Sequence, residues 1–211
     1  MNWTYDPRLH RFRDARGNLV SMRDLITTRD RFVAAREAMA QALGESFASG
    51  AISLDDFEAQ FRALTAETIT AMQMFGAGGE AMLRQKPVHI ARLVELLTRQ
   101  IPYADAFLSE LRAGEVSPEA AGARAAMYQA AGINAYEVAQ SDDWGISLPY
   151  YPADGDTECH SNCRCSWEIT TNWDEAQQRD VTYARWQTEG DDKVCDGCQG
   201  RADAWPGNVI A

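Results

Sequence analysis

Long hydrophobic runs are missing from this sequence of 211 residues. No stretch approaches the run of about eighteen apolar residues that marks a membrane-spanning helix. Residues 1–7 also lack the basic and then apolar pattern of a secretory signal peptide. We therefore expect no membrane contact and synthesis in a reducing cytoplasm, where clustered cysteines favour metal or redox chemistry over structural disulfides.

Basic residues are in the minority. The chain carries 20 Lys and Arg against 31 Asp and Glu, which gives a net charge of -11. Proteins bind nucleic acids mainly by placing Lys and Arg on the phosphate backbone, so we do not expect contact with DNA. A basic protein surface is the partner that this charge favours.

The sequence signatures of common enzyme sites are also missing. We find no zinc-protease or zinc-deaminase motif, no nucleophile elbow, no phosphate-binding loop and no dinucleotide fingerprint. The three histidines, His10, His89 and His160, are spread over the chain and form no pair with a serine or cysteine nucleophile. We therefore predict that the protein is not an enzyme, and that neither His10 nor His89 binds a metal.

Residues 21–140 contain apolar side chains at helical spacing. Ser21 with Asp24 and Ser53 with Asp56 have the pattern of helix N-caps, and a further helix is expected to begin at Ser117 and Pro118. Pro102 is expected to kink or end the third helical run. We interpret the apolar face of that run as core: Ile90, Leu93, Val94, Leu97 and Ile101. The pattern predicts a bundle of four or five helices.

Residues 1–20 precede this bundle as an arm with few apolar side chains. The residues on either side of positions 15–17 predict a small hairpin. Two interpretations stay open for it. The arm is either a strand pair packed on its own protein or a segment that anchors a partner through its larger side chains, Trp3, Tyr5, Leu9 and Phe12.

The composition changes at Ser141, beyond which helical periodicity fades and five of the six tryptophans lie. So small a segment buries little surface alone and often needs a metal to hold it. The sequence thus predicts a mainly α protein in three parts. These are an arm (1–20), a helical domain (21–140) and a small cysteine-rich, metal-binding module of α+β or irregular structure (141–211).

All five cysteines lie in the last part, in two clusters: Cys159, Cys163 and Cys165, then Cys195 and Cys198. Two short cysteine clusters joined by a spacer are typical of a single metal centre, with zinc favoured over an iron–sulfur cluster. The simplest ligand set is Cys163, Cys165, Cys195 and Cys198. Cys159 is an alternative to Cys165, and His160 is a weaker candidate. A disulfide or redox pair and unrelated free thiols remain open.

Residues 160–165, His-Ser-Asn-Cys-Arg-Cys, resemble the H-P-N-C-R-C signature of the tailed-phage head-morphogenesis (minor head protein) family. Residues 191–198, which follow Trp186, resemble that family's D-x-x-V-C-x-x-C segment. The two motifs stand here in reversed order, and Ser161 replaces a proline. Metal ligands need proximity in space rather than a fixed chain order, so the reversal is compatible with the same metal site.

The resemblance implies a structural minor virion protein that is made in the host cytoplasm and located in the virion. Its partners would be the portal, neck or capsid proteins, with several copies in each particle. Two rival functions remain: a thiol-disulfide oxidoreductase that uses Cys195 and Cys198, and a zinc-ribbon protein that binds nucleic acid. The acidic charge disfavours the second of these.

Overall fold

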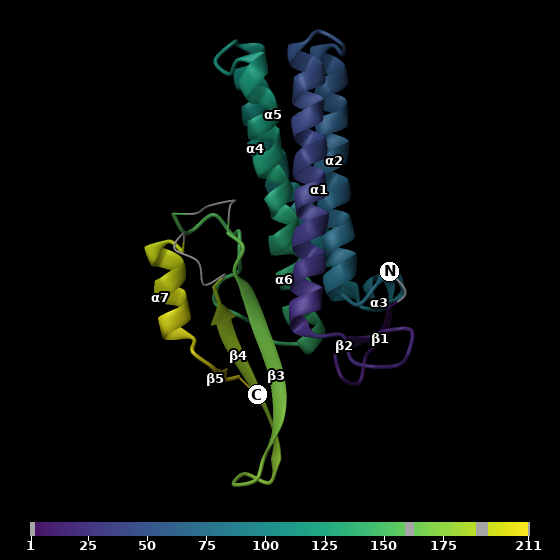
Figure 1. Cartoon of the computed structure of the whole chain (residues 1–211), viewed down its shortest axis with the longest axis vertical. Helices are drawn as coiled ribbons and strands as arrows, with labels where there is room; N and C mark the ends of the chain where they lie inside the picture. Colours follow the sequence, from purple (N-terminus) through teal and green to yellow (C-terminus); the bar gives the residue numbers. More distant parts are fainter. Residues whose placement is uncertain (1–2, 159–162, 189–193, 211) are drawn as a thin grey trace.

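The structure is a computed structural model that describes residues 3–158, 163–188 and 194–210. Figure 1 shows long helices standing side by side, with a small sheet and one short helix beside their lower part. Helices make up 59% of the described residues and strands 14%. This confirms the predicted fold class, a mainly α protein whose helical part precedes a small module that contains strands.

Four long rods form the helical part. Three are single helices, α1 (Met22–Ala48), α2 (Leu54–Gly76) and α4 (Pro87–Arg112), and a short helix, α3 (Glu80–Gln85), leads into α4. The fourth rod is made of α5 (Pro118–Met127), the single 3-10 turn η1 (Tyr128–Ala130) and α6 (Ala131–Trp144), which follow one another without a loop. In this rod α5 packs along α1, and α6 packs along α2.

The helices begin where the sequence predicts. The Ser21 side chain accepts a hydrogen bond from the Asp24 N–H, and Ser53 forms a complete capping box with Asp56. Pro118 occupies the first position of α5. The third helix, however, does not end at Pro102. Helix α4 continues through this residue to Arg112, because the side chains beyond it pack into the bundle core and offset the lost backbone hydrogen bond.

Two apolar clusters form the bundle core. The upper one centres on Phe57, Phe61 and Phe107, and the lower one on Ile69, Ile133 and other side chains of α1, α2, α4 and α6. The predicted core face of α4 is only partly buried. Leu93 and Leu97 pack against the lower cluster, whereas the prediction is wrong for three residues that are exposed: Ile90, Val94 and Ile101. Helix α4 contacts α2, α3 and α6, and its apolar face is wider than the described residues cover.

Helices α1 and α5 approach one another at two glycines. A Cβ atom placed on Gly44 would lie 2.1 Å from the Gly122 Cα atom, far inside van der Waals contact. The obstacle is backbone, which cannot rotate away as a side chain can. Glycine at both positions is therefore what allows these two helices to pack so closely.

We expect Gly44→Ala to lower the free energy of unfolding by about 1–3 kcal/mol or more, because the added methyl group forces α1 and α5 apart. Urea denaturation followed by circular dichroism measures this loss. Gly200→Ala is the matched control, since no atom lies within 4 Å of its added Cβ. The control should be neutral or slightly stabilising. Equal denaturation midpoints for the two variants would show that the close helix contact is wrong.

The N-terminal arm packs on its own chain. Strand β1 (Thr4–Asp6) pairs antiparallel with β2 (Arg11–Arg13), and the Val20 N–H donates to the Phe12 carbonyl at 2.8 Å to close the predicted turn around residues 15–17. The aromatic rings of the arm join Leu25 and Phe75 in a separate small core. Of the four suggested partner anchors, Trp3, Tyr5 and Phe12 are used in this way and Leu9 is exposed. The first of the two interpretations therefore describes the arm.

The C-terminal part contains a three-stranded antiparallel sheet. Strands β3 (Ser166–Asp174) and β4 (Arg179–Gln187) pair over their full length, and β5 (Asn208–Val209) adds to the middle of β4. Helix α7 (Asp196–Ala204) lies beside the sheet (Figure 1). Trp167 and Trp186 are buried between these elements with their ring centres 5.2 Å apart. They form the small core of the module.

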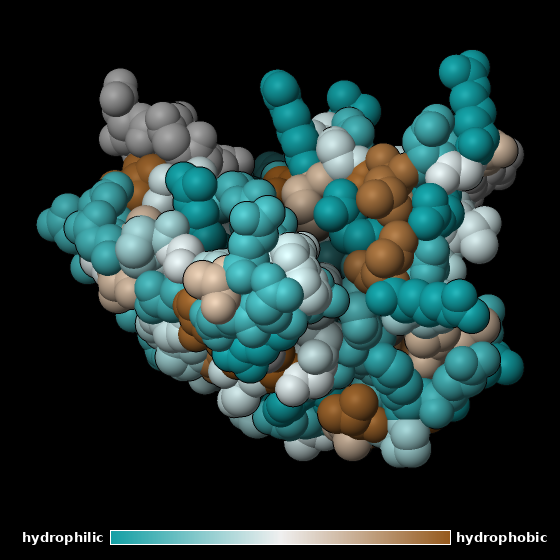
Figure 2. Space-filling model, turned by 90° about the horizontal axis from the view of Figure 1, so that it is seen from below, coloured by the Kyte–Doolittle hydropathy of each residue, from teal (hydrophilic) through white to brown (hydrophobic). Residues whose placement is uncertain are grey.

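Among the described residues, no helix is both long enough and apolar enough to cross a lipid bilayer. Seen from below, the molecular surface is mostly hydrophilic, with apolar side chains in small separate groups (Figure 2).

Candidate metal centre

Two chain segments bring the cysteines of the module together. Cys163 and Cys165 lie just before β3 begins at Ser166. Cys195 is the N-cap residue of α7, and Cys198 lies in the first turn of that helix. Because α7 packs beside the sheet, the start of β3 and the start of α7 meet at one place.

The sulfur atoms of Cys163, Cys165 and Cys198 all lie within 4.8 Å of one another. The Cys163 and Cys198 sulfurs are 3.7 Å apart. Four thiolates at about 2.3 Å from a tetrahedral zinc ion would be separated by about 3.8 Å, whereas a disulfide requires about 2.05 Å. All three side chains are buried. The three sulfurs therefore have the spacing and the burial that are typical of a structural metal site.

The sulfur cluster also favours an ionised ligand. A hydrogen bond from the Cys165 thiol lowers the pKa of Cys163 to about 5, although burial opposes this change. The backbone N–H of Ala153 donates to the same sulfur and acts in the same direction. The pKa of Cys165 is raised by its hydrogen bond to Cys163 and by burial. Metals bind the thiolate form of cysteine, so the lowered pKa of Cys163 favours metal binding at neutral pH.

The structure thus brings together three of the five predicted ligands. Cys195 is half-buried and packs against the same apolar cluster. Cys159 and His160 lie outside the described residues. His10 and His89 lie elsewhere, around Asp143. The described residues therefore supply a three-cysteine group that could hold a metal ion, and both cysteine clusters contribute to it.

Arg29 of α1 connects the helical bundle to this group, a link that the sequence analysis missed. Its guanidinium is fully buried and donates to the Glu137 carboxylate of α6 at 2.5 Å. It also donates to the backbone carbonyls of Cys165 and Arg164, both at 3.2 Å. The bundle therefore holds directly the segment that carries one of the clustered sulfurs.

Glu137 holds the same segment from the other side. Its second carboxylate oxygen accepts the Trp167 backbone N–H at 3.0 Å. Burial raises the pKa of Glu137 to about 7, while the charge of Arg29 and the Trp167 hydrogen bond oppose the rise. A charged pair in a site this dry needs further hydrogen bonds to be stable, and the backbone of residues 164–167 provides them.

A signal for this pair was present in the sequence. Arg29 stands four residues after Leu25 and four before Val33, both of which are core residues of α1. Glu137 stands four residues after the core residue Ile133 of α6. Each of these two helices thus has a charged residue at the spacing of its buried side chains. This indicates a buried ion pair, since neither charge is stable there alone.

Polar contacts hold helix α7 near its N-terminus and again at Arg201. The Gly197 N–H, at its N-terminus, donates to the Glu158 carboxylate at 3.0 Å. The Arg201 guanidinium binds Asp154 at 2.9 Å and lies over the Tyr150 ring at 4.3 Å from its centre. These contacts hold the helix that carries Cys198 against the segment that leads to the first cysteine cluster.

His10 and His89 belong to a second polar cluster, around the buried carboxylate of Asp143 on α6. His10 Nδ1 lies 2.6 Å from this carboxylate, Lys86 donates to it at 2.5 Å, and the Tyr5 hydroxyl donates to it as well. Burial alone would raise the pKa of Asp143, but the nearby His89 ring and hydrogen bonds from Lys86, Tyr5 and His10 outweigh it and hold the pKa well below its usual range. The cluster ties the N-terminal arm to the end of α6.

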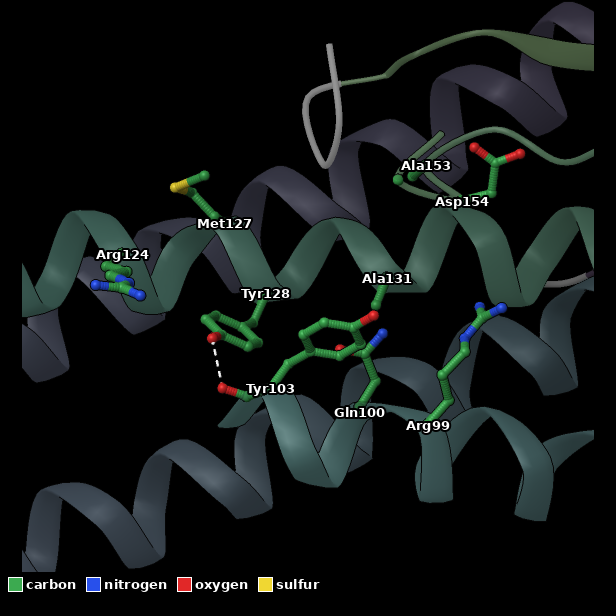
Figure 3. Close-up of a pocket in the computed structure, with 10 residues that line it drawn as sticks. Arg99, Gln100, Tyr103, Arg124, Met127, Tyr128, Ala131, Ala153 and Asp154 are labelled. Carbon is green, nitrogen blue, oxygen red and sulfur yellow. Dashed lines mark hydrogen bonds between the residues drawn. The ribbon is translucent and has the colours of Figure 1, made fainter. Parts of the chain in front are cut away.

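A cleft of about 420 Å³ lies between α4 and the rod of α5, η1 and α6. Figure 3 shows Tyr103 and Tyr128 side by side in it, with Arg124 towards one end and Arg99 towards the other. Arg124 forms an ion pair with Glu110, and Arg99 donates to Asn134 at 2.7 Å. The described residues that line the cleft include no serine, cysteine or histidine, so this lining offers no nucleophile with a matched base.

Comparisons of this chain with protein-family models, with curated proteins and with solved structures found no match.

Proposed function

We propose that the protein is a structural minor component of a tailed-phage particle, located at the head, portal or neck. In this proposal one metal ion, zinc in preference to an iron–sulfur cluster, holds the C-terminal module together. The protein acts by binding portal, neck or capsid proteins in several copies, and it catalyses no reaction.

The observation that carries this proposal is the buried group formed by Cys163, Cys165 and Cys198. These cysteines come from the two motifs that resemble those of the phage head-morphogenesis family, so the reversed order of the motifs still brings their sulfurs together. The fourth ligand is Cys195 or Cys159 in this proposal. The bundle holds the group through Arg29, which suits a part whose role is to keep a fixed shape.

One observation favours the thiol-disulfide oxidoreductase as a second candidate. Cys195 caps α7 and Cys198 follows within the first turn, and a C-x-x-C pair at a helix N-terminus is the arrangement that activates a thiolate. The Cys198 sulfur, however, lies 3.7 Å from that of Cys163 and is buried. Burial beside another sulfur suits a metal ligand. In a redox pair, Cys198 would instead have to reach the sulfur of Cys195.

The proposal predicts that the protein is present in purified phage particles in several copies and that a phage without it fails to complete or join its heads. Quantitative mass spectrometry of gradient-purified particles and electron microscopy of the deletion lysate measure these outcomes. Absence of the protein from mature particles would contradict the virion role. A thiol-disulfide exchange rate comparable to that of thioredoxin-like enzymes, lost in Cys195→Ser, would establish the second candidate instead.

A further inference from the structure

Helix α4 carries a row of apolar side chains that its own chain leaves largely uncovered. Ile90, Val94 and Ile101 are 45%, 57% and 52% exposed, and the half-buried Leu97 completes the row. These four residues, which we name the α4 seam, are spaced four, three and four residues apart. That spacing places them in one line along a helix and is the pattern of a coiled-coil contact.

The uncovered row differs from ordinary surface apolar residues. Single exposed apolar side chains are common on proteins and need no explanation, but a continuous row over three helical turns marks a contact surface. Helices α2, α3 and α6 contact α4, yet Ile90, Val94 and Ile101 stay about half exposed. The sequence pattern is that of a buried face, and the described residues of a single copy do not bury it.

The charges beside the α4 seam sum to zero, which limits the charge of a partner that can bind there. Between positions 88 and 105, α4 carries two arginines and two acidic residues, so its net charge there is zero in a chain whose total is -11. These charges are also paired within the chain. Arg92 binds Glu95 at 2.5 Å, and Arg62 of α2 binds Asp105 at 2.6 Å. A strongly basic or acidic partner finds no complementary charge here, whereas a neutral apolar helix meets no repulsion.

We propose that the α4 seam binds the α4 seam of a second copy of this chain, in a two-fold symmetric dimer. The second copy offers a neutral helix whose apolar row has the matching spacing, and a symmetric contact needs only one such surface. The seam is about 17 Å long. It covers less than the area of about 800 Å² per partner that a standard stable interface buries. The dimer is therefore weak in dilute solution and forms where copies are concentrated, as on a larger assembly.

Sedimentation velocity of the full-length, metal-loaded protein, at concentrations from about 5 to about 500 µM, tests this proposal. The wild-type protein should shift from monomer to dimer over this range. Val94→Asp and Ile101→Asp should each weaken the dimer at least tenfold, because each places a charge in the apolar contact. Both residues are more than half exposed, so both variants should remain folded by circular dichroism.

Met39→Asp is the matched control, since Met39 is equally exposed but lies on α1. It should dimerise as the wild type does. An equimolar mixture of Val94→Lys and Val94→Glu should regain the dimer that each variant alone has lost. The proposal is overturned if the wild type stays monomeric throughout, if Met39→Asp weakens the dimer as strongly as Val94→Asp, or if the mixture gains nothing.

Discussion

Removal of the proposed metal ion is expected to unfold the chain beyond α6 while the long helices persist. The three buried sulfurs share one small core with Trp167 and Trp186, so loss of the ion would leave thiolates in contact with apolar side chains. Structural zinc sites contribute apparent binding free energies of about 10–16 kcal/mol, more than so small a core supplies. Cys163→Ser and Cys198→Ser should have the same effect as chelation. Tryptophan fluorescence and limited proteolysis of residues 145–210 measure the loss, and circular dichroism follows the helices.

Cys159→Ser and Cys195→Ser serve as a matched pair in this experiment. The substitution that removes the fourth ligand should release the metal, and the other should leave about one ion per chain by elemental analysis. An absorption spectrum distinguishes zinc from an iron–sulfur cluster, because only the cluster is coloured. A metal-free protein with native fluorescence and native protease resistance would refute a structural role for the metal.

Arg29→Met is expected to lower the free energy of unfolding by about 3–5 kcal/mol, because it leaves the Glu137 carboxylate buried without its partner. The substitution also removes the donors to the carbonyls of Arg164 and Cys165. Urea denaturation measures the total loss. Hydrogen exchange should show its location, with faster exchange at the Trp167 N–H than in the wild type.

Two controls separate the ion pair from general damage. Arg84→Met breaks an exposed pair with Glu80 and should change the free energy of unfolding by less than about 1 kcal/mol. The double variant Arg29→Met/Glu137→Leu removes both buried charges and should recover much of the loss seen in Arg29→Met. If adding Glu137→Leu lowers the free energy of unfolding of Arg29→Met further instead of restoring it, the two side chains do not act as a pair.

The helical part could be predicted because its signals are local. Ser21 and Ser53 mark helix starts through side-chain caps within one turn, and Pro118 marks the start of α5, so a short stretch of sequence contains what decides them. The expected helix end at Pro102 is wrong because the effect of a proline depends on how the residues around it pack. The side chains that keep α4 helical beyond this proline lie one and two turns further on, and their contacts come from other helices.

The cysteine clusters predicted a metal site but not which sulfurs would meet. That choice depends on how α7 packs against the start of β3, which no local pattern specifies. The spacing of Arg29 and Glu137 along their helices marks each of them as a buried charge, but it does not say that the two meet. They lie 108 residues apart in the chain, and no local pattern pairs them.

The contacts of the arm with Asp143 have a consequence for the order in which the chain folds during synthesis. Tyr5 and His10 are synthesised 138 and 133 residues before the carboxylate that binds them. Until then the described apolar contacts of the arm are those with α1 and α2. We therefore expect a chain that stops before residue 143 to hold residues 3–20 less firmly, because only α6 brings the Asp143 carboxylate to them.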